Sequence, residues 1–220
     1  MSTSTTKSTG SSGKSRRVLP KEIRREQLIH ATMKSIARNG LSGTTLAQVT
    51  REAGLSMGIA NLHFESKDKL LVETLRYVTD EYNRGHIAIL ENATYQNTAE
   101  RLEAIVQFDF SPAVTTRDKM AVWFAFWGEA KSRPTYQRIC RSTDFRAEEA
   151  MSELLEAAIT ESADRQLDPT LIASGYTSLV DGLWLSMLLA PKHLSRARAL
   201  RIARDYLAGY FPDHIRPENA

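Results

Sequence analysis

The chain has 220 residues, of which 42% are hydrophobic and 25% charged, so it can build a core without disulfides. Its single cysteine, Cys140, excludes an internal disulfide. The net charge of +3 is unevenly distributed, because residues 1–69 hold 12 Lys and Arg against 5 Asp and Glu while the remainder is acidic. This asymmetry favours a polyanionic partner at the front of the chain.

The N-terminal tail, residues 1–19, is predicted to be disordered. Ten of its first fifteen residues are Ser or Thr, and it has no apolar stretch to pack or to serve as a secretory signal. The basic residues that end it, Lys14, Arg16 and Arg17, are either solvated or reach a DNA groove.

The first predicted helix covers residues 21–38 and ends at Asn39-Gly40, a usual C-terminal stop. A capping box of Thr45 and Gln48 then begins a short helix.

Gly54 ends this short helix, because glycine adopts a positive φ without steric cost, and Ser56 begins a second one that runs to about Leu62. Two helices of about two turns, joined by a tight turn, are the pattern of a helix-turn-helix, whose second helix enters the major groove of DNA.

Helices are predicted for the rest of the chain as well. Ser66 caps a long helix over residues 66–93, and five more follow at 98–110, 117–131, 134–162, 169–190 and 195–210. The expected fold is therefore all-α, with a three-helix DNA-binding domain at residues 20–66 and a larger helical domain at residues 67–215.

The helix at 169–190 is apolar enough to be considered as a membrane span. Its single charge, Asp181, lies near the middle, where insertion is costly, so we expect a helix buried in protein on nearly all sides and a cytoplasmic protein without a membrane partner. Gly175 and Gly182 in this helix predict a close approach of another backbone.

The candidate DNA-reading residues lie on and around the two short helices. Asn61 can bond an adenine edge at two points, and an exposed apolar side chain such as Met57 or Ile59 can meet a thymine methyl. Gly58 lets the backbone approach the duplex, and Thr45 offers its hydroxyl and nearby amides to a phosphate.

Lys67 lies in the first turn of the long helix, where the helix dipole disfavours a cation unless a phosphate is nearby. Plainer interpretations remain, because Thr45 also caps its helix, Asn61 suits any surface, and His63 suits a core or a cap. The predicted DNA-binding set is Thr45, Ser56, Met57, Gly58, Ile59, Asn61, His63 and Lys67.

The run TTLAQVTREAGLSMGIANLHFESKDKLL, Thr44–Leu71, resembles the DNA-binding domain of the TetR family of transcriptional regulators. The AGLSMG turn, the pair His63-Phe64 and the ending Leu70-Leu71 carry this resemblance. It implies DNA contacts from Thr45, Met57, His63 and Lys67, and core positions for Ala60 and Phe64.

One departure concerns the two positions before His63-Phe64. The family usually has two tyrosines there, one of which grips a phosphate, whereas this chain has Asn61-Leu62. The phosphate contact from that position is therefore in doubt.

Two later segments, Val122–Arg141 and Asp181–Leu207, resemble the choline-responsive betaine regulators of the BetI type. This resemblance implies a homodimer, paired through its last two helices, that represses genes of choline uptake and glycine betaine synthesis from a palindromic double-stranded operator and is released by choline. The alternative is a TetR-type repressor of another pathway that responds to a different amine, a lipid or a drug.

Aromatic residues on the later helices give this ligand some physical support. Trp123 and Trp127 lie one turn apart, and aromatic faces attract a quaternary ammonium through cation–π interaction. A carboxylate such as Asp181 or Glu129 can balance the charge, although aromatic residues at helical spacing also serve as plain core and Asp181 can instead bond an arginine or a helix end. The predicted ligand-binding set is Trp123, Phe124, Trp127, Tyr176, Asp181 and Trp184.

No catalytic motif is recognisable in the chain. It has no H-E-x-x-H, paired-cysteine, P-loop or G-x-S-x-G pattern, and its five histidines are scattered. We therefore expect a protein that is not an enzyme and that uses neither a metal nor a cofactor.

Overall fold

The computed structural model describes residues 20–161 and 166–215, so the predicted N-terminal tail lies outside the described residues. Within those two ranges the chain is helical and contains no strand, which confirms the all-α prediction. The helices are α1 (Lys21–Gly43), α2 (Leu46–Ala53), α3 (Met57–His63), α4 (Lys67–Leu90), α5 (Thr98–Asp109), α6 (Arg117–Ala130), α7 (Pro134–Glu161), α8 (Pro169–Leu189) and α9 (Arg196–Ala208).

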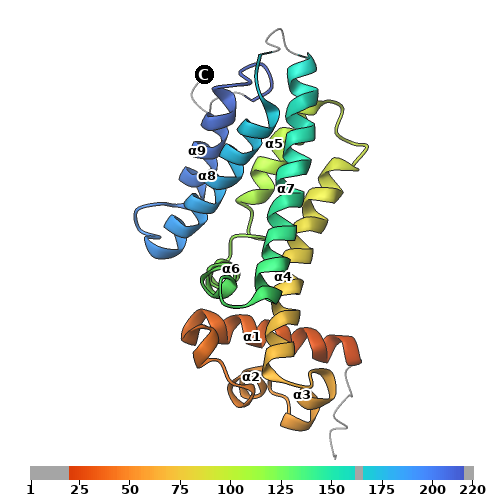
Figure 1. The fold of residues 1–220 in the computed structure, drawn as a ribbon, viewed down its shortest axis with the longest axis vertical. Helices are drawn as coiled ribbons and strands as arrows, with labels where there is room; N and C mark the ends of the chain where they lie inside the picture. The colour runs from red at the N-terminus through yellow and green to blue at the C-terminus, as the bar shows by residue number, and fades with distance from the viewer. Residues whose placement is uncertain (1–19, 162–165, 216–220) are drawn as a thin grey trace, which may run out of the picture.

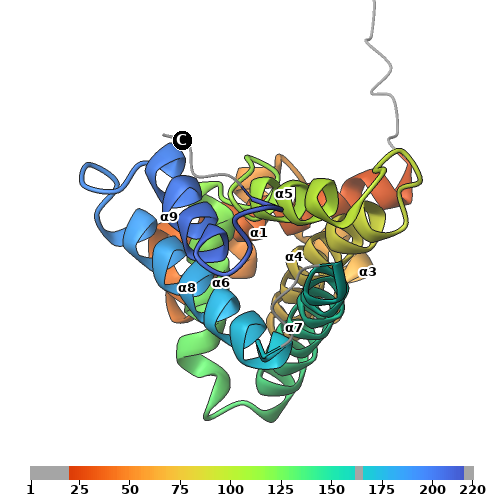
Figure 2. The same ribbon diagram turned by 90° about the horizontal axis from the view of Figure 1, so that it is seen from above.

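The helices divide into a small head and a larger body (Figure 1). Helices α1, α2 and α3 form the head at one end of the molecule, and α4 runs from the head up into the body beside α7. Helix α6 is seen nearly end-on above α1, against which it packs. Viewed from above, α8 and α9 lie side by side at one outer edge (Figure 2).

The predicted caps of the short helices are confirmed. The Thr45 side chain accepts from the backbone N–H of Gln48, whose own side chain accepts from the backbone N–H of Thr45, so the capping box is complete. The Ser56 and Ser66 hydroxyls accept in the same way from backbone N–H groups three residues further on. Local hydrogen bonds therefore determine where α2, α3 and α4 begin.

Helix α1 is interrupted where the sequence predicts its end. Gly40 has φ +70° and ψ 177°, outside the helical region, but one further short turn follows and carries α1 to Gly43. This extra turn buries Leu41.

The hydrophobic core consists of two clusters, one in the head and one in the body. The head cluster comprises Leu28, Ile29, Ala31, Val49, Ala60, Phe64 and Leu70, which confirms the predicted core positions of Ala60 and Phe64. Three α1 residues, Met33, Ile36 and Leu41, belong instead to the body cluster. The head therefore shares part of its hydrophobic packing with the body.

Helix α8 is long and apolar enough to cross a membrane by length and composition, but one side of it packs into the body core. The prediction that it is buried on nearly all sides is wrong, because Leu171, Leu185 and Leu189 are exposed on the described chain. Its two glycines differ. A Cβ at Gly175 would overlap the Tyr206 hydroxyl of α9, so the close neighbour is a side chain and not a backbone, whereas Gly182 is exposed with nothing near it.

Candidate DNA-reading head and ligand cage

The turn between α2 and α3 is held in place by its backbone. Gly54 adopts φ +65°, a conformation that favours glycine, and the N–H of Leu55 donates to the carbonyl of Thr50 at 2.9 Å. The turn therefore directs α3 away from α2 and leaves one face of α3 at the surface, as a reading helix requires.

Most of the predicted DNA-reading residues lie on this outer surface. Met57 and Asn61, one turn apart on α3, are both exposed, whereas Ile59 is half-buried and so less available than expected. Leu62, which the sequence reasoning did not select, is 70% exposed and offers the most accessible apolar side chain on α3. The remaining exposed members of the predicted set are Thr45, Ser56 and Gly58.

Lys67 and His63 are more enclosed than the other predicted residues. The Lys67 ammonium donates to the backbone carbonyl of Ser42 at 3.2 Å, so the structure gives this cation a partner within the protein. The pKa of His63 is lowered, first by burial and then by cations in the first turns of α1, including Lys21 and Arg24. These cations give the head a positive edge beside α3.

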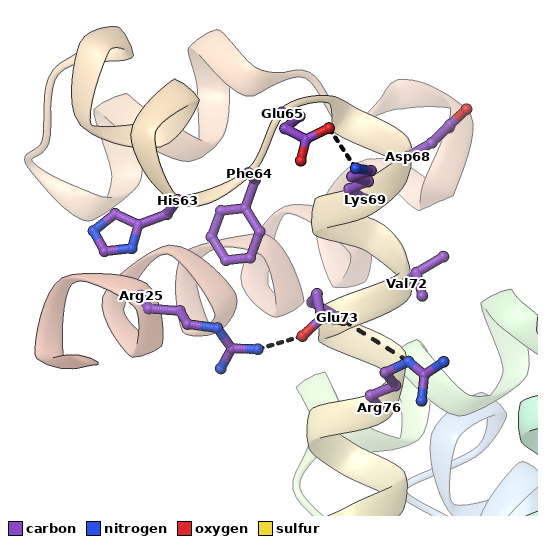
Figure 3. A pocket seen from close by; sticks show the side chains of 9 residues that line it. All are labelled: Arg25, His63, Phe64, Glu65, Asp68, Lys69, Val72, Glu73 and Arg76. Carbon is purple, nitrogen blue, oxygen red and sulfur yellow. Dashed lines mark hydrogen bonds and ion pairs between the residues drawn. The ribbon is translucent and has the colours of Figure 1, made fainter. Parts of the chain in front are cut away.

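A groove of about 490 Å³ lies beside α3, between α1 and α4 (Figure 3). Its charged side chains are largely paired across it, with Arg25 bonded to Glu73 and Lys69 bonded to Glu65. The Arg25 guanidinium also lies 5.9 Å from the centre of the Phe64 ring. These contacts brace α1 and the end of α3 against α4.

A second site lies in the body, where four aromatic rings from three helices converge; we call it the cage. Tyr82 of α4 meets Trp123 of α6 and Trp184 of α8 edge-on, with ring centroids 6.1 Å and 5.7 Å apart. Trp127, one turn beyond Trp123, lies 6.0 Å from it. Such rings offer several π faces to a single bound group.

Two carboxylates face the cage, Asp144 of α7 and Asp181 of α8. Burial raises the pKa of Asp144 to about 6, with a further contribution from Glu148. Burial, and then the charges of Asp144 and Asp109, raise the pKa of Asp181 to about 7. The cage lining contains no Lys, Arg or His, and consists of Tyr82, Trp123, Trp127, Thr143, Asp144, Ala147, Thr177, Asp181 and Trp184.

The open space inside the cage is about 20 Å³, enough for one water molecule. A trimethylammonium group is several times larger. A ligand of that kind therefore needs the surrounding side chains or helices to move apart. Among the charged and aromatic groups, Trp123 and Trp184 are buried, whereas the other four are half-buried.

The structure brings four of the six predicted ligand residues together in the cage: Trp123, Trp127, Asp181 and Trp184. The other two lie outside its lining. Phe124 packs edge-on against Trp127, and the Tyr176 hydroxyl donates to the Asp109 carboxylate at 2.8 Å. Sequence reasoning missed Tyr82 and Asp144, although Tyr82 shares one face of its helix with the apolar residues Leu75 and Val78 at helical spacing.

Comparison with protein families places both halves of the chain. The model of the bacterial regulatory proteins of the tetR family matches residues 28–74, and that of the BetI-type transcriptional repressor C-terminal domain matches residues 98–212.

The chain belongs to the TetR family. Its relatives include proteins called HTH-type transcriptional regulator BetI. The one from Burkholderia mallei (strain NCTC 10229) is 35% identical over 187 residues, which is 85% of this chain and 93% of the relative. The one from Paraburkholderia xenovorans (strain LB400) is 34% identical over the same shares. The predicted TetR-type regulator with a BetI-type C-terminal domain is thus confirmed.

Solved structures share the fold of this TetR-family chain. A transcriptional regulator from Pseudomonas aeruginosa PAO1 has a TM-score of 0.75 at 27% identity and covers 89% of this chain and 94% of its own. A regulator from Saccharomonospora viridis, solved in complex with choline, has a TM-score of 0.74 at 22% identity and covers 84% and 96%.

The two matched segments contain most of both candidate sites. The predicted DNA-reading residues lie within residues 28–74, and all the lining residues of the cage except Tyr82 lie within residues 98–212. Tyr82 lies on α4 between the two matches, so the helix that leaves the head also contributes a wall of the cage.

Proposed function

We propose that this TetR-family repressor senses choline in the cytoplasm and regulates genes for choline uptake and glycine betaine synthesis. The observation that carries the proposal is the cage, with four aromatic rings and two carboxylates and no basic side chain in its lining. Relatives named BetI and a choline complex of a protein with the same fold support the same ligand.

The chemistry of the cage suits a quaternary ammonium. This cation has no N–H to donate, so it is held by π faces and by charge; each ring contributes about 0.5–2 kcal/mol. Asp181 and Asp144 supply the balancing charge. The hydroxyl of choline gives one of these carboxylates a hydrogen bond, which a tetraalkylammonium of the same size lacks.

Release from DNA follows from the small size of the closed cage. Because the free volume is about 20 Å³, choline has to displace Trp123 and Trp127 on α6 outward. Helix α6 also packs against α1 of the head, so this movement reaches the DNA-reading helices. A 100-fold loss of operator affinity requires about 2.7 kcal/mol of coupling between the two sites.

We place the dimer interface on the exposed side of α8 together with α9. Leu171, Leu185 and Leu189 are exposed apolar residues on this side, and the exposed Gly182 allows close approach of a partner helix. A two-fold dimer carries two heads about one helical turn of DNA apart, about 34 Å, and therefore binds a palindromic operator.

In each head, Met57 and Asn61 read base edges in the major groove. Thr45 and Ser56 at the starts of α2 and α3 direct hydroxyl and amide groups to the phosphates, and the small Gly58 lets α3 enter the groove closely.

The test measures operator binding by fluorescence anisotropy with increasing choline. Operator sites are first selected from random duplexes, and we expect an inverted repeat. Millimolar choline should release wild-type protein from this operator.

In the variant Trp127→Ala, choline should bind about 10-fold more weakly while ligand-free operator affinity is unchanged. Phe124→Ala is the control on the same helix, because Phe124 packs against Trp127 but does not line the cage, so it shows what loss of that packing alone does to choline binding. If millimolar choline does not change operator binding, choline is not the effector. The assignment of the protein as a DNA-binding repressor would then still stand.

A further inference from the structure

A buried carboxylate lies directly behind the cage. Asp109, the last residue of α5, is 1% exposed. Its side chain accepts hydrogen bonds from the hydroxyls of Tyr82 at 3.1 Å and Tyr176 at 2.8 Å, and contacts the His86 ring nitrogen Nε2 at 2.7 Å. A group that accepts three bonds in this way is an ionised carboxylate, which has acceptors only.

The basic group that contacts this carboxylate in the described part of the chain is the His86 ring. The second ring nitrogen of His86, Nδ1, is buried and has no hydrogen-bond partner in the described chain. The ring therefore meets the carboxylate through Nε2, which donates to Asp109. Asp109 is therefore held by three side chains, the two phenols and the His86 ring.

Asp109 also forms hydrogen bonds with the polar groups of two of the four cage side chains. It binds the Tyr82 hydroxyl through its carboxylate, and its backbone carbonyl accepts from the Trp184 indole N–H at 2.9 Å. The polar edges of both side chains thus point toward Asp109, while their rings line the cage. One residue fixes rings from α4 and α8 at the same time.

The C-terminal end of α5 packs closely against α4 next to Asp109. A Cβ at Gly85 would overlap the Phe108 ring, so glycine is needed for Phe108 to pack there. Phe108 precedes Asp109, and Gly85 precedes His86. This packing limits any shift of Asp109 away from Tyr82.

We propose that Asp109 is the residue that positions the cage rings and makes the cage select cations over neutral molecules of the same shape. The proposal rests on the proposed function of the cage as the ligand site. Asp109 acts through Tyr82 and Trp184 and does not touch the ligand.

Two physical effects support the selectivity. A phenol that donates its proton to a carboxylate has a more electron-rich ring, so the Tyr82 face attracts a cation more strongly. The carboxylate also acts from a buried position, where screening by solvent is weak. Its reach across the cage is visible at Asp181, whose pKa is raised in part by the charge of Asp109.

The test compares choline with 3,3-dimethylbutan-1-ol, in which carbon replaces the charged nitrogen at nearly the same shape. Calorimetry on Asp109→Asn should show choline binding weakened about 10-fold and the neutral alcohol weakened less than about 2-fold, because the variant removes a charge. Equal losses for both ligands would mean that Asp109 only supports the fold, and would overturn the proposal. Ligand-free operator affinity verifies that the variant is folded.

A second pair of variants does not depend on the folding of Asp109→Asn. Tyr82→Phe keeps the ring but removes its bond to Asp109, and we expect choline affinity to fall about 3-fold to 10-fold with little change for the neutral alcohol. Tyr176→Phe removes a similar bond to the same carboxylate from a ring outside the cage lining, and should alter choline affinity less than about 2-fold. A loss at Tyr176→Phe as large as that at Tyr82→Phe would contradict the mechanism through Tyr82.

Tetramethylammonium separates this proposal from the choline assignment. Wild-type protein that binds tetramethylammonium but not choline overturns choline as the effector, and the Asp109 series is then measured with tetramethylammonium. Wild-type protein that binds neither cation overturns both the cage and the role of Asp109.

Discussion

The head and the cage, the two proposed binding sites, are built from residues arranged in opposite ways. The predicted DNA-reading residues lie within one short stretch, from Thr45 to Lys67, and most are exposed. The cage residues come from four helices, are all buried or half-buried, and span the chain from Tyr82 to Trp184. A surface that meets a large polyanion needs only a rigid helix and exposed donors, whereas a site for a small cation has to exclude water and bring distant side chains together.

The largest expected difference between the two sites is their response to salt. Operator binding releases counterions from phosphates, so affinity should fall about 10³-fold or more between 50 and 200 mM salt if the dimer makes six or more phosphate contacts. Choline binding takes place in a buried site where screening is weak and should change less than about 2-fold. Anisotropy and calorimetry over the same salt series test this, and equal salt responses would contradict the division of roles.

The next effect concerns a single residue of the head. Asn61→Ala removes a side chain that is exposed on α3, and the loss of one two-point base contact should lower operator affinity about 10-fold to 100-fold and relax the preference at one base pair. Choline affinity is the internal control and should be unchanged. Unaltered binding to the selected operator and to its single-base variants would remove Asn61 from the reading surface.

A smaller effect is expected from pH at the cage. Asp181 and Asp144 have pKa values raised to about 7 and about 6, and a cation binds best when they are ionised. Choline affinity should therefore fall about 10-fold from pH 8 to pH 6. Asp181→Asn should bind choline weakly at both pH values and lose most of this dependence, as calorimetry would show. A flat profile in the wild-type protein would exclude the carboxylates from binding.

The same carboxyl groups affect stability in the opposite direction. Because the pKa of Asp181 is higher in the fold than in the unfolded chain, the native state holds the proton more tightly, and stability falls as pH rises from about 4 to about 7. Asp181→Asn should consequently raise the melting temperature by a few degrees at pH 8 and change it little at pH 4. The cage thus retains a carboxylate that weakens the free protein.

The smallest expected effect lies at the junction between the two regions. Arg133, in the turn between α6 and α7, pairs with Asp68 of α4 at 3.5 Å, and its side chain is 48% exposed. Such exposed pairs contribute about 0–1 kcal/mol, so Arg133→Ala should change the free energy of unfolding by less than that and operator affinity by less than about 2-fold. Denaturant unfolding and anisotropy check this; a large loss of choline-dependent release would instead make the pair part of the coupling.

Local signals explain how well the head was predicted. The caps at Thr45, Ser56 and Ser66 and the positive φ of Gly54 depend on residues within four positions of one another, so the sequence contains them directly. The difference in exposure between Ile59 and Leu62 depends on how α3 is rotated against the head core, which no local pattern specifies.

The cage was predicted only in part for a related reason. Periodicity shows that Tyr82 faces inward but does not show which helix it meets, and Asp144 lies in a charged stretch of α7 that looks like a solvated surface. Tyr176 fitted the aromatic pattern equally well, yet its hydroxyl binds Asp109 on the far side of the rings. Contacts between distant helices decide these three positions.

The placement of Met33, Ile36 and Leu41 of α1 within the body cluster has a practical consequence for engineering. A fragment cut after α3 would expose these side chains to water and tend to aggregate. A chimeric biosensor that joins this head to another effector-binding domain therefore needs, in that domain, a helix equivalent to α6 with a complementary apolar surface. Redesigning this interface should be the first step.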